Sequence, residues 1–366
     1  MYENETNEEI LKRMLDRVPT SVDKREGSVI FDAAAPAAIE FELLYAQLDY
    51  FLRNTFGDTA DREYLIERAK ERGLTPYAAS AATVKVKAAP DTVMLPIGSR
   101  YSYDDVNYAI TEDLGGGEYE AVCETAGIAG NKPAGRIIPI SYTAGLQTVE
   151  LTEVLIPGED EEATEDFRAR YLASFGDQAY GGNIADYRNK VNAIPGVGGV
   201  KVYPVWNGGG TVRLVFMTSE YKVPQPEFVE QVQTAIDPTQ NQGEGIGIAP
   251  IGHTVTVEGC RSSDVEIGLH VTFDSGTFED HRSEIEAVID AYFLELNAKW
   301  QDTQKVSVDV FTNAGIVVRI SQIESRILDL ESVTDIQHTT LNGQEENLTL
   351  DPDALAVRGA VTNGTD

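Results

Sequence analysis

The sequence predicts a multidomain α+β protein, with an N-terminal helical segment, a small β-rich domain and then ferredoxin-like α+β units. The chain has 366 residues, more than one ordinary core holds. Helical spacing of apolar residues comes first, short alternating strands separated by Gly and Pro follow, and mixed patterns complete the chain. We therefore expect four domains: 1–80 (a helical region), 81–156 (β-rich), 157–262 (α+β) and 263–366 (C-terminal α+β).

The N-terminal helical region carries an apolar seam. Four large side chains recur at steps of three, four and three, the spacing of a coiled-coil contact: Phe41, Leu44, Leu48 and Phe51. The seam requires something to pack on, because this region has little core of its own. Two partners are open: the chain's own next helix, over Tyr64–Arg72, or a bundle shared with other subunits.

The β-rich domain is indicated by short alternating segments. Thr83–Lys87 and Tyr119–Cys123 alternate between apolar and polar residues, and Gly115-Gly116-Gly117 forms a turn. Such strands stabilise one another only as a set, so we expect a small sandwich or a partial barrel.

The third domain begins with six acids and no base between Glu159 and Asp166, which we interpret as a solvated linker. Two amphipathic helices follow, the second capped by Asn183. The strands Val197–Val205 and Thr211–Thr218 flank a Gly-rich loop and predict a hairpin. With the helix begun by Pro226 and the next strand, this order predicts a split βαβ unit.

The C-terminal domain is predicted to alternate helices and strands in the same way. We expect a helix ending near Trp300, strands over Val306–Phe311 and Val333–Leu341, and a frayed end over 359–366. Between the two strands, five apolar residues recur at four, three, four and three, in a predicted helix about 22 Å long: Ile316, Ile320, Ile323, Ile327 and Leu330. Internal core and contact with another subunit are both open for this seam.

Composition limits the possible partners. The formal net charge of −31 disfavours binding to nucleic acid and to anionic membrane surfaces. No apolar run approaches the roughly 20 residues that span a bilayer, so no membrane insertion is expected. The polar, acidic start is unlike a secretory signal, and we expect synthesis and assembly in a bacterial cytoplasm.

Motifs that would carry chemistry do not stand out. The four histidines form no HxxxH pair, and there is no GxSxG elbow or Walker loop. Cys123 and Cys260 are far apart and fit buried thiols better than a disulfide or a metal pair. The loops around Gly196 and Gly243 lack the glycine spacing of a nucleotide site. We therefore expect no catalytic residue, no cofactor and no metal.

Several stretches together resemble one protein family. GED, FRAR, GGN, ADY and IPGVGGVKVYPV occur in this order between residues 158 and 205. REGSVIFDAAAPAAIEFELLYAQLDYFLRNTF, YLIERAKERGLTPYAASAA, LPIGSRYSYDDVNYAI and ETAGIAGNKPAGRI precede them. Over roughly residues 25–350 the chain resembles the baseplate J proteins of contractile phage tails and tail-like bacteriocins.

The resemblance implies a structural wedge subunit of a baseplate. It implies a six-fold ring around the central spike that couples target contact to contraction of the sheath. Its implied partners are companion wedge proteins, further copies of itself, and sheath-proximal and spike or hub proteins. Both seams above are candidate interfaces. A cell-wall-glycan hydrolase with acidic catalytic residues and a tail fibre or receptor-binding module are the alternatives, and a phage, a bacteriocin and a secretion device are all open as the parent particle.

Overall fold

The structure is a computed structural model that describes residues 2, 4–175, 180–306 and 310–364. The protein is of mixed α+β class, as predicted. Its contacts group the chain into two compact units, Met1–Tyr77 with Glu162–Asp177, and Ala78–Glu161 with Gln178–Asp366. The domain boundaries given above stay a prediction.

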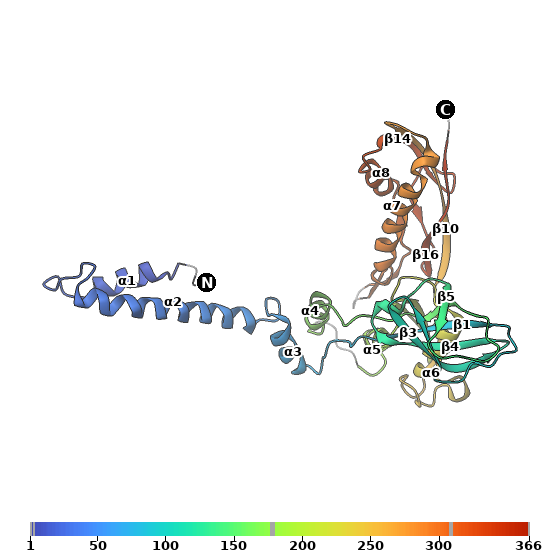
Figure 1. Ribbon diagram of the computed structural model, residues 1–366, viewed down its shortest axis with the longest axis horizontal. Helices are drawn as coiled ribbons and strands as arrows, with labels where there is room; N and C mark the ends of the chain where they lie inside the picture. The colour runs from blue at the N-terminus through green and yellow to red at the C-terminus, as the bar shows by residue number, and fades with distance from the viewer. Residues whose placement is uncertain (1, 3, 176–179, 307–309, 365–366) are drawn as a thin grey trace. The chain divides into compact units, whose positions relative to one another are not determined.

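The first unit is helical. Its elements are α1 (Asn7–Asp16), α2 (Val29–Thr55), α3 (Arg62–Lys70) and α4 (Thr164–Ala173). Figure 1 shows α1 running alongside α2. A small core joins α3 to α4, in which Leu65 packs with Phe167 and Tyr171. The Arg168 guanidinium donates to the carbonyl oxygens of Gly57 and Ala60, so α4 is fixed to the α2–α3 loop.

The β-rich region is a closed barrel, whereas a sandwich or a partial barrel was predicted. Its strands are β1 (Ala81–Ala89), β2 (Arg100–Tyr103), β3 (Val106–Gly115), β4 (Glu118–Ala126), β5 (Gly135–Pro139) and β6 (Thr148–Ile156). They close in the order β1-β4-β3-β2-β5-β6, so β1 pairs antiparallel with both β4 and β6. Val84, Val86, Tyr108 and Leu151 fill the interior.

The predicted hairpin is confirmed in the next region. It contains α5 (Ile184–Asn192), β7 (Val197–Pro204), β8 (Thr211–Thr218), α6 (Pro226–Ile236) and β9 (Thr254–Gly259). The predicted split is wrong, because β8 pairs directly and in parallel with β9, and no strand lies between them. The Asn183 side chain accepts from the Asp186 N–H at 2.8 Å, as the N-cap prediction requires.

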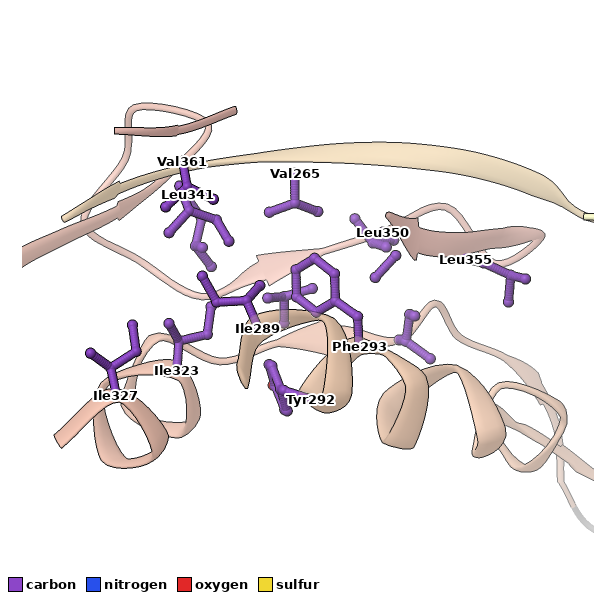
Figure 2. Close-up of a cluster of buried hydrophobic side chains, with 14 of the residues drawn as sticks. Val265, Ile289, Tyr292, Phe293, Ile323, Ile327, Leu341, Leu350, Leu355 and Val361 are labelled. Carbon is purple, nitrogen blue, oxygen red and sulfur yellow. The ribbon is translucent and has the colours of Figure 1, made fainter. Parts of the chain in front are cut away.

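The C-terminal region places two helices against a three-stranded sheet of order β14-β10-β16. Its elements are β10 (Arg261–Phe273), α7 (Phe278–Ala298), β11 (Gln304–Val306), β12 (Phe311–Asn313), β13 (Val317–Val318), α8 (Ile320–Leu328), β14 (Val333–Leu341), β15 (Leu348–Thr349) and β16 (Ala354–Asn363). Figure 2 shows Ile289 and Phe293 of α7 packing in one cluster with Val265 of β10 and Ile323 of α8. The main sheets of the two regions after the barrel, β7-β8-β9 and β14-β10-β16, each have three strands among the described residues, so ferredoxin-like units are not confirmed.

Two C-terminal predictions are corrected by the way the strands pair. The end predicted to fray forms β16, which pairs in parallel with β10 as far as Asn363. The predicted strand Val306–Phe311 has its ends in β11 and β12, which pair antiparallel with each other, while 307–309 lie outside the described residues.

A buried lysine joins β7 to the C-terminal region. The Lys201 side chain is fully buried, and its Nζ donates to the carbonyl oxygens of Ala314 (3.1 Å) and Pro352 (2.6 Å). It also lies 4.6 Å from the centre of the Trp300 ring. Burial lowers the pKa of Lys201 to about 8, while Asp353 and Asp351 act in the opposite direction.

The pKa of Lys201 predicts that its contribution to stability rises with pH above 8. In the unfolded chain a lysine keeps its proton up to about pH 10.4, so a rise through pH 8 deprotonates only the folded form. The buried Cys260 thiol acts in the opposite direction over the same range, because an unfolded thiol titrates at about pH 8.5 and burial raises the pKa of Cys260 to about 12. The thiol is unchanged in Lys201→Met, so between pH 8 and 9 we expect the free energy of unfolding of the wild-type chain to increase by about 1 kcal/mol relative to that of the variant. Urea denaturation of both chains at both pH values measures the difference, and the same pH dependence in the two chains would contradict this account.

Candidate assembly surface

The predicted N-terminal seam lies on α2. This helix has 27 residues, so it extends about 40 Å. It begins at Ser28, whose hydroxyl accepts from the Phe31 N–H, and Asp32 places a negative charge in the first turn, where the helix dipole favours it. Ala, Leu and Glu recur along it and are strong helix formers. Local sequence therefore favours this helix, although Pro36 lies within it.

One face of α2 is covered by the chain itself. Ala38 is buried, and the Asn7 side-chain amide donates to the Glu42 carboxylate at 2.8 Å. The rings of Tyr2 and Tyr45 lie 5.3 Å apart between centroids. Positions 38, 42 and 45 thus form the face that meets α1 and the residues before it.

The predicted seam lies on a second face and is exposed. The exposed fractions are 45% for Phe41, 47% for Leu44, 41% for Leu48 and 64% for Phe51. We call these four residues the first stripe. The chain's own α3 does not cover it, since α3 packs on α4 and meets α2 near its end, where the Tyr50 and Tyr64 rings contact edge to face. The interpretation in which the seam packs on Tyr64–Arg72 is therefore wrong.

A third face of α2 carries apolar residues that the sequence analysis missed. Ile39 is 51% exposed, Leu43 53% and Tyr50 43%, and we call them the second stripe. They recur at steps of four and seven, a signal hidden by the apolar residues between them. At 3.6 residues per turn, the α1 face and the two stripes are separated by roughly a third of a turn each. The exposed Glu40 and Gln47 lie between the stripes.

The second predicted seam belongs mostly to the chain's own core. Ile316, Ile323 and Ile327 are at most 2% exposed, and Ile320 and Leu330 are partly buried against the same cluster. Figure 2 shows Ile323 and Ile327 pointing toward the α7 residues and the sheet. These buried side chains are not available to another subunit. The predicted helix also starts later, at Ile320, and Ile316 precedes β13.

The other singled-out groups have structural partners. The Asp237 carboxylate accepts from the Gly243 and Val255 N–H groups and so holds the second Gly-rich loop. In the acidic linker, Glu162 pairs with Arg170 at 2.7 Å and Asp160 accepts from the Ile128 N–H. Both cysteines are free and buried. Across the described ranges, no three His, Cys, Asp or Glu side chains gather as metal ligands would.

A search of the described helices for a bilayer-spanning segment, which would be both long and apolar, finds none.

Three models of one protein family match the chain. The Baseplate J-like protein barrel domain matches residues 83–158, the Baseplate J-like central domain 179–259, and the Baseplate J-like protein C-terminal domain 265–364. The first of these ranges coincides with the closed barrel described above.

Relatives with similar sequences cover most of the chain. It is 36% identical to the "Phage-like element PBSX protein XkdT" of Bacillus subtilis (strain 168), over 96% of this chain and 95% of that protein. It is 25% identical to the "Baseplate protein gp47" of Escherichia phage Mu, over 73% of this chain and 76% of that protein. A chain in the cryo-EM structure of the anti-feeding prophage (AFP) baseplate aligns with this protein over 96% of this chain and 90% of that chain. Its TM-score of 0.42 and its 11% identity are too low for an inference about function.

Proposed function

The chain belongs to the Baseplate J-like protein family, and from this premise we propose that it is a wedge subunit in the baseplate of a contractile tail or tail-like injection particle. Family membership itself makes it a baseplate protein of a phage or phage-like particle. In the proposal, copies of the chain contribute to a six-fold ring around the central spike, and the ring couples contact with the target to contraction of the sheath.

The exposed apolar faces of α2 carry this proposal. A helix that is apolar on most of its surface is normally buried, yet α2 meets its own chain only on the α1 face and, near its end, through the contact of Tyr50 with Tyr64. The first stripe has the spacing by which helices pack on helices, so the partners that fit it are helices. Two separate stripes favour two partner helices for each copy of α2, supplied by companion wedge proteins or by a second copy of this chain.

We propose a structural role, without catalysis, cofactor or metal. The buried thiols support it, because burial raises the pKa of Cys260 to about 12 and of Cys123 above its usual range, so neither is activated as a nucleophile. No specific observation on the described residues favours the hydrolase or the tail-fibre interpretation. Assembly would occur in the bacterial cytoplasm, and the finished particle would hold the chain in its baseplate beside sheath-proximal and spike or hub proteins.

The native mass of the chain tests this proposal. We expect the chain alone to be monomeric or weakly self-associated, because α2 lacks its partners. Co-expression with the proteins encoded beside it should give a stable hetero-oligomer containing two or more copies of this chain, measured by mass photometry. A chain that stays monomeric with every neighbour would contradict the wedge role.

A further inference from the structure

The sheet of β7, β8 and β9 is covered on both faces. The buried side chains of α5 and α6 pack on one face, around Val200 and Leu214. On the other face, Val215 and Met217 join the core of the C-terminal region. We call this second contact the β7 joint; it brings β7 and β8 against residues 300–304, 313–314 and 352–353.

Glutamine side chains take the place of a neighbouring strand at the free edge of β7. The Val200 N–H donates to Gln301 Oε1 at 2.7 Å, and the Val202 N–H donates to Gln304 Oε1 at 3.0 Å. Gln304 Nε2 donates back to the Val202 carbonyl at 3.0 Å. The edge of β7 is therefore satisfied only while the C-terminal region is docked, and water can replace each of these bonds when it is not.

Lys201 occupies the centre of the joint, where an apolar side chain would be expected. Its two hydrogen-bond acceptors, the carbonyl oxygens of Ala314 and Pro352, are uncharged. Pro352 O also accepts from Trp300 Nε1 at 2.9 Å, so the ammonium shares that oxygen with another donor. A buried cation without a carboxylate in contact loses more in hydration free energy than two carbonyls and the face of the Trp300 ring return. The lowered pKa of Lys201 reflects the same imbalance.

Other polar groups in the joint are also incompletely satisfied. Asn192 Oδ1, Arg213 Nε and Asn313 Oδ1 are buried and have no hydrogen-bond partner among the described residues. Arg213 nevertheless pairs with Asp353 at 2.8 Å, and the Tyr203 hydroxyl donates to the same carboxylate. These bonds fix the geometry of the joint. The buried polar groups without a partner would gain hydration when it opens.

We propose that the β7 joint is a releasable contact and that Lys201 keeps it weaker than an apolar side chain would. Docked and released arrangements of the C-terminal region against β7 would give the chain two discrete states. This inference concerns the chain itself and does not depend on the wedge role. It predicts that the joint opens without unfolding of the sheet.

Hydrogen exchange at single amides tests the proposal. In the intact wild-type chain, the Val200 and Val202 amides should exchange faster than the amides of β8, the central strand, because their acceptors leave with the C-terminal region. In Lys201→Met, which removes the charge and keeps a long apolar chain, both should exchange about tenfold more slowly. Gln304→Ala should accelerate the Val202 amide, and this variant checks that the amide reports the joint.

Lys299→Met is the matched control, because it removes an exposed lysine beside Trp300. It should leave the exchange of Val200 and Val202 unchanged. Two results would overturn the proposal. Wild-type amides at these positions that exchange as slowly as those of β8 would mean that the joint opens only on global unfolding. Faster exchange in Lys201→Met would mean that the lysine strengthens the joint.

Discussion

Replacing Leu44 and Leu48 with aspartate is expected to leave a folded, monomeric chain that no longer enters the hetero-oligomer. Both side chains are more than 40% exposed, so the carboxylates remain in water in the free chain. In the assembled bundle they would be desolvated against apolar partners, at several kcal/mol for each charge. That loss corresponds to a reduction in affinity of at least about a thousandfold. Mass photometry of the co-expressed proteins measures it.

Gln47→Asp is the matched control for this experiment. Gln47 is an exposed neighbour of Leu48 on the same helix, but it lies between the two stripes. It adds one negative charge to α2, as Leu48→Asp does, and should leave assembly nearly intact. If it abolished assembly as strongly as Leu48→Asp, net charge and not the first stripe would be the cause. Loss of helical circular dichroism in the double variant would show that the stripe belongs to the chain's own core.

The first stripe could be predicted from the sequence because heptad spacing is a local property. The second stripe is just as exposed, but it could not be predicted from the sequence. Apolar residues follow one another so closely between Ile39 and Leu44 that no single spacing stands out. Density of this kind predicts a helix with several neighbours. It does not show which of these neighbours the chain itself supplies. Here α1 covers the face of Ala38, where positions 38, 42 and 45 hold Ala, Glu and Tyr and no large aliphatic residue.

What the sequence could not predict depends on contacts between distant residues. Barrel closure requires Val86 of β1 to pair with Leu151 of β6, and no local pattern encodes that partnership. Lys201 alternates with Val200 and Val202 as a solvent-facing residue would, and only the docked C-terminal region makes it buried. Ile316 continues the spacing of the apolar residues of α8, although it lies before β13. The spacing therefore predicted a helix through a segment that is not helical.

The second large effect is expected at α8. Ile323→Asp should destabilise the C-terminal region by about 4 kcal/mol or more, because Ile323 is 1% exposed and its carboxylate would have no partner in a cluster of Ile289, Phe293 and Val265. Guanidinium denaturation followed by tryptophan fluorescence measures the change, because Trp300 is buried in the same cluster whereas the other tryptophan, Trp206, is already 45% exposed. Leu328→Asp is the control on the same helix: Leu328 is 43% exposed, so its effect should stay within about 0.5 kcal/mol.

Comparing Ile323→Asp with Leu328→Asp also shows whether this seam belongs to the chain's own core or to an interface with another subunit. An Ile323→Asp chain that remained stable but failed to assemble would mean that α8 leaves its own core to meet another subunit, against the burial described here. A chain that loses its C-terminal fold, while Leu328→Asp keeps both fold and assembly, would place the seam inside the subunit. The two seams share the same spacing, so the difference between them lies in what the chain itself packs against each helix. At α8 the sheet and α7 fill that place, whereas at α2 the first stripe stays exposed, and the proposed wedge role places a partner helix there.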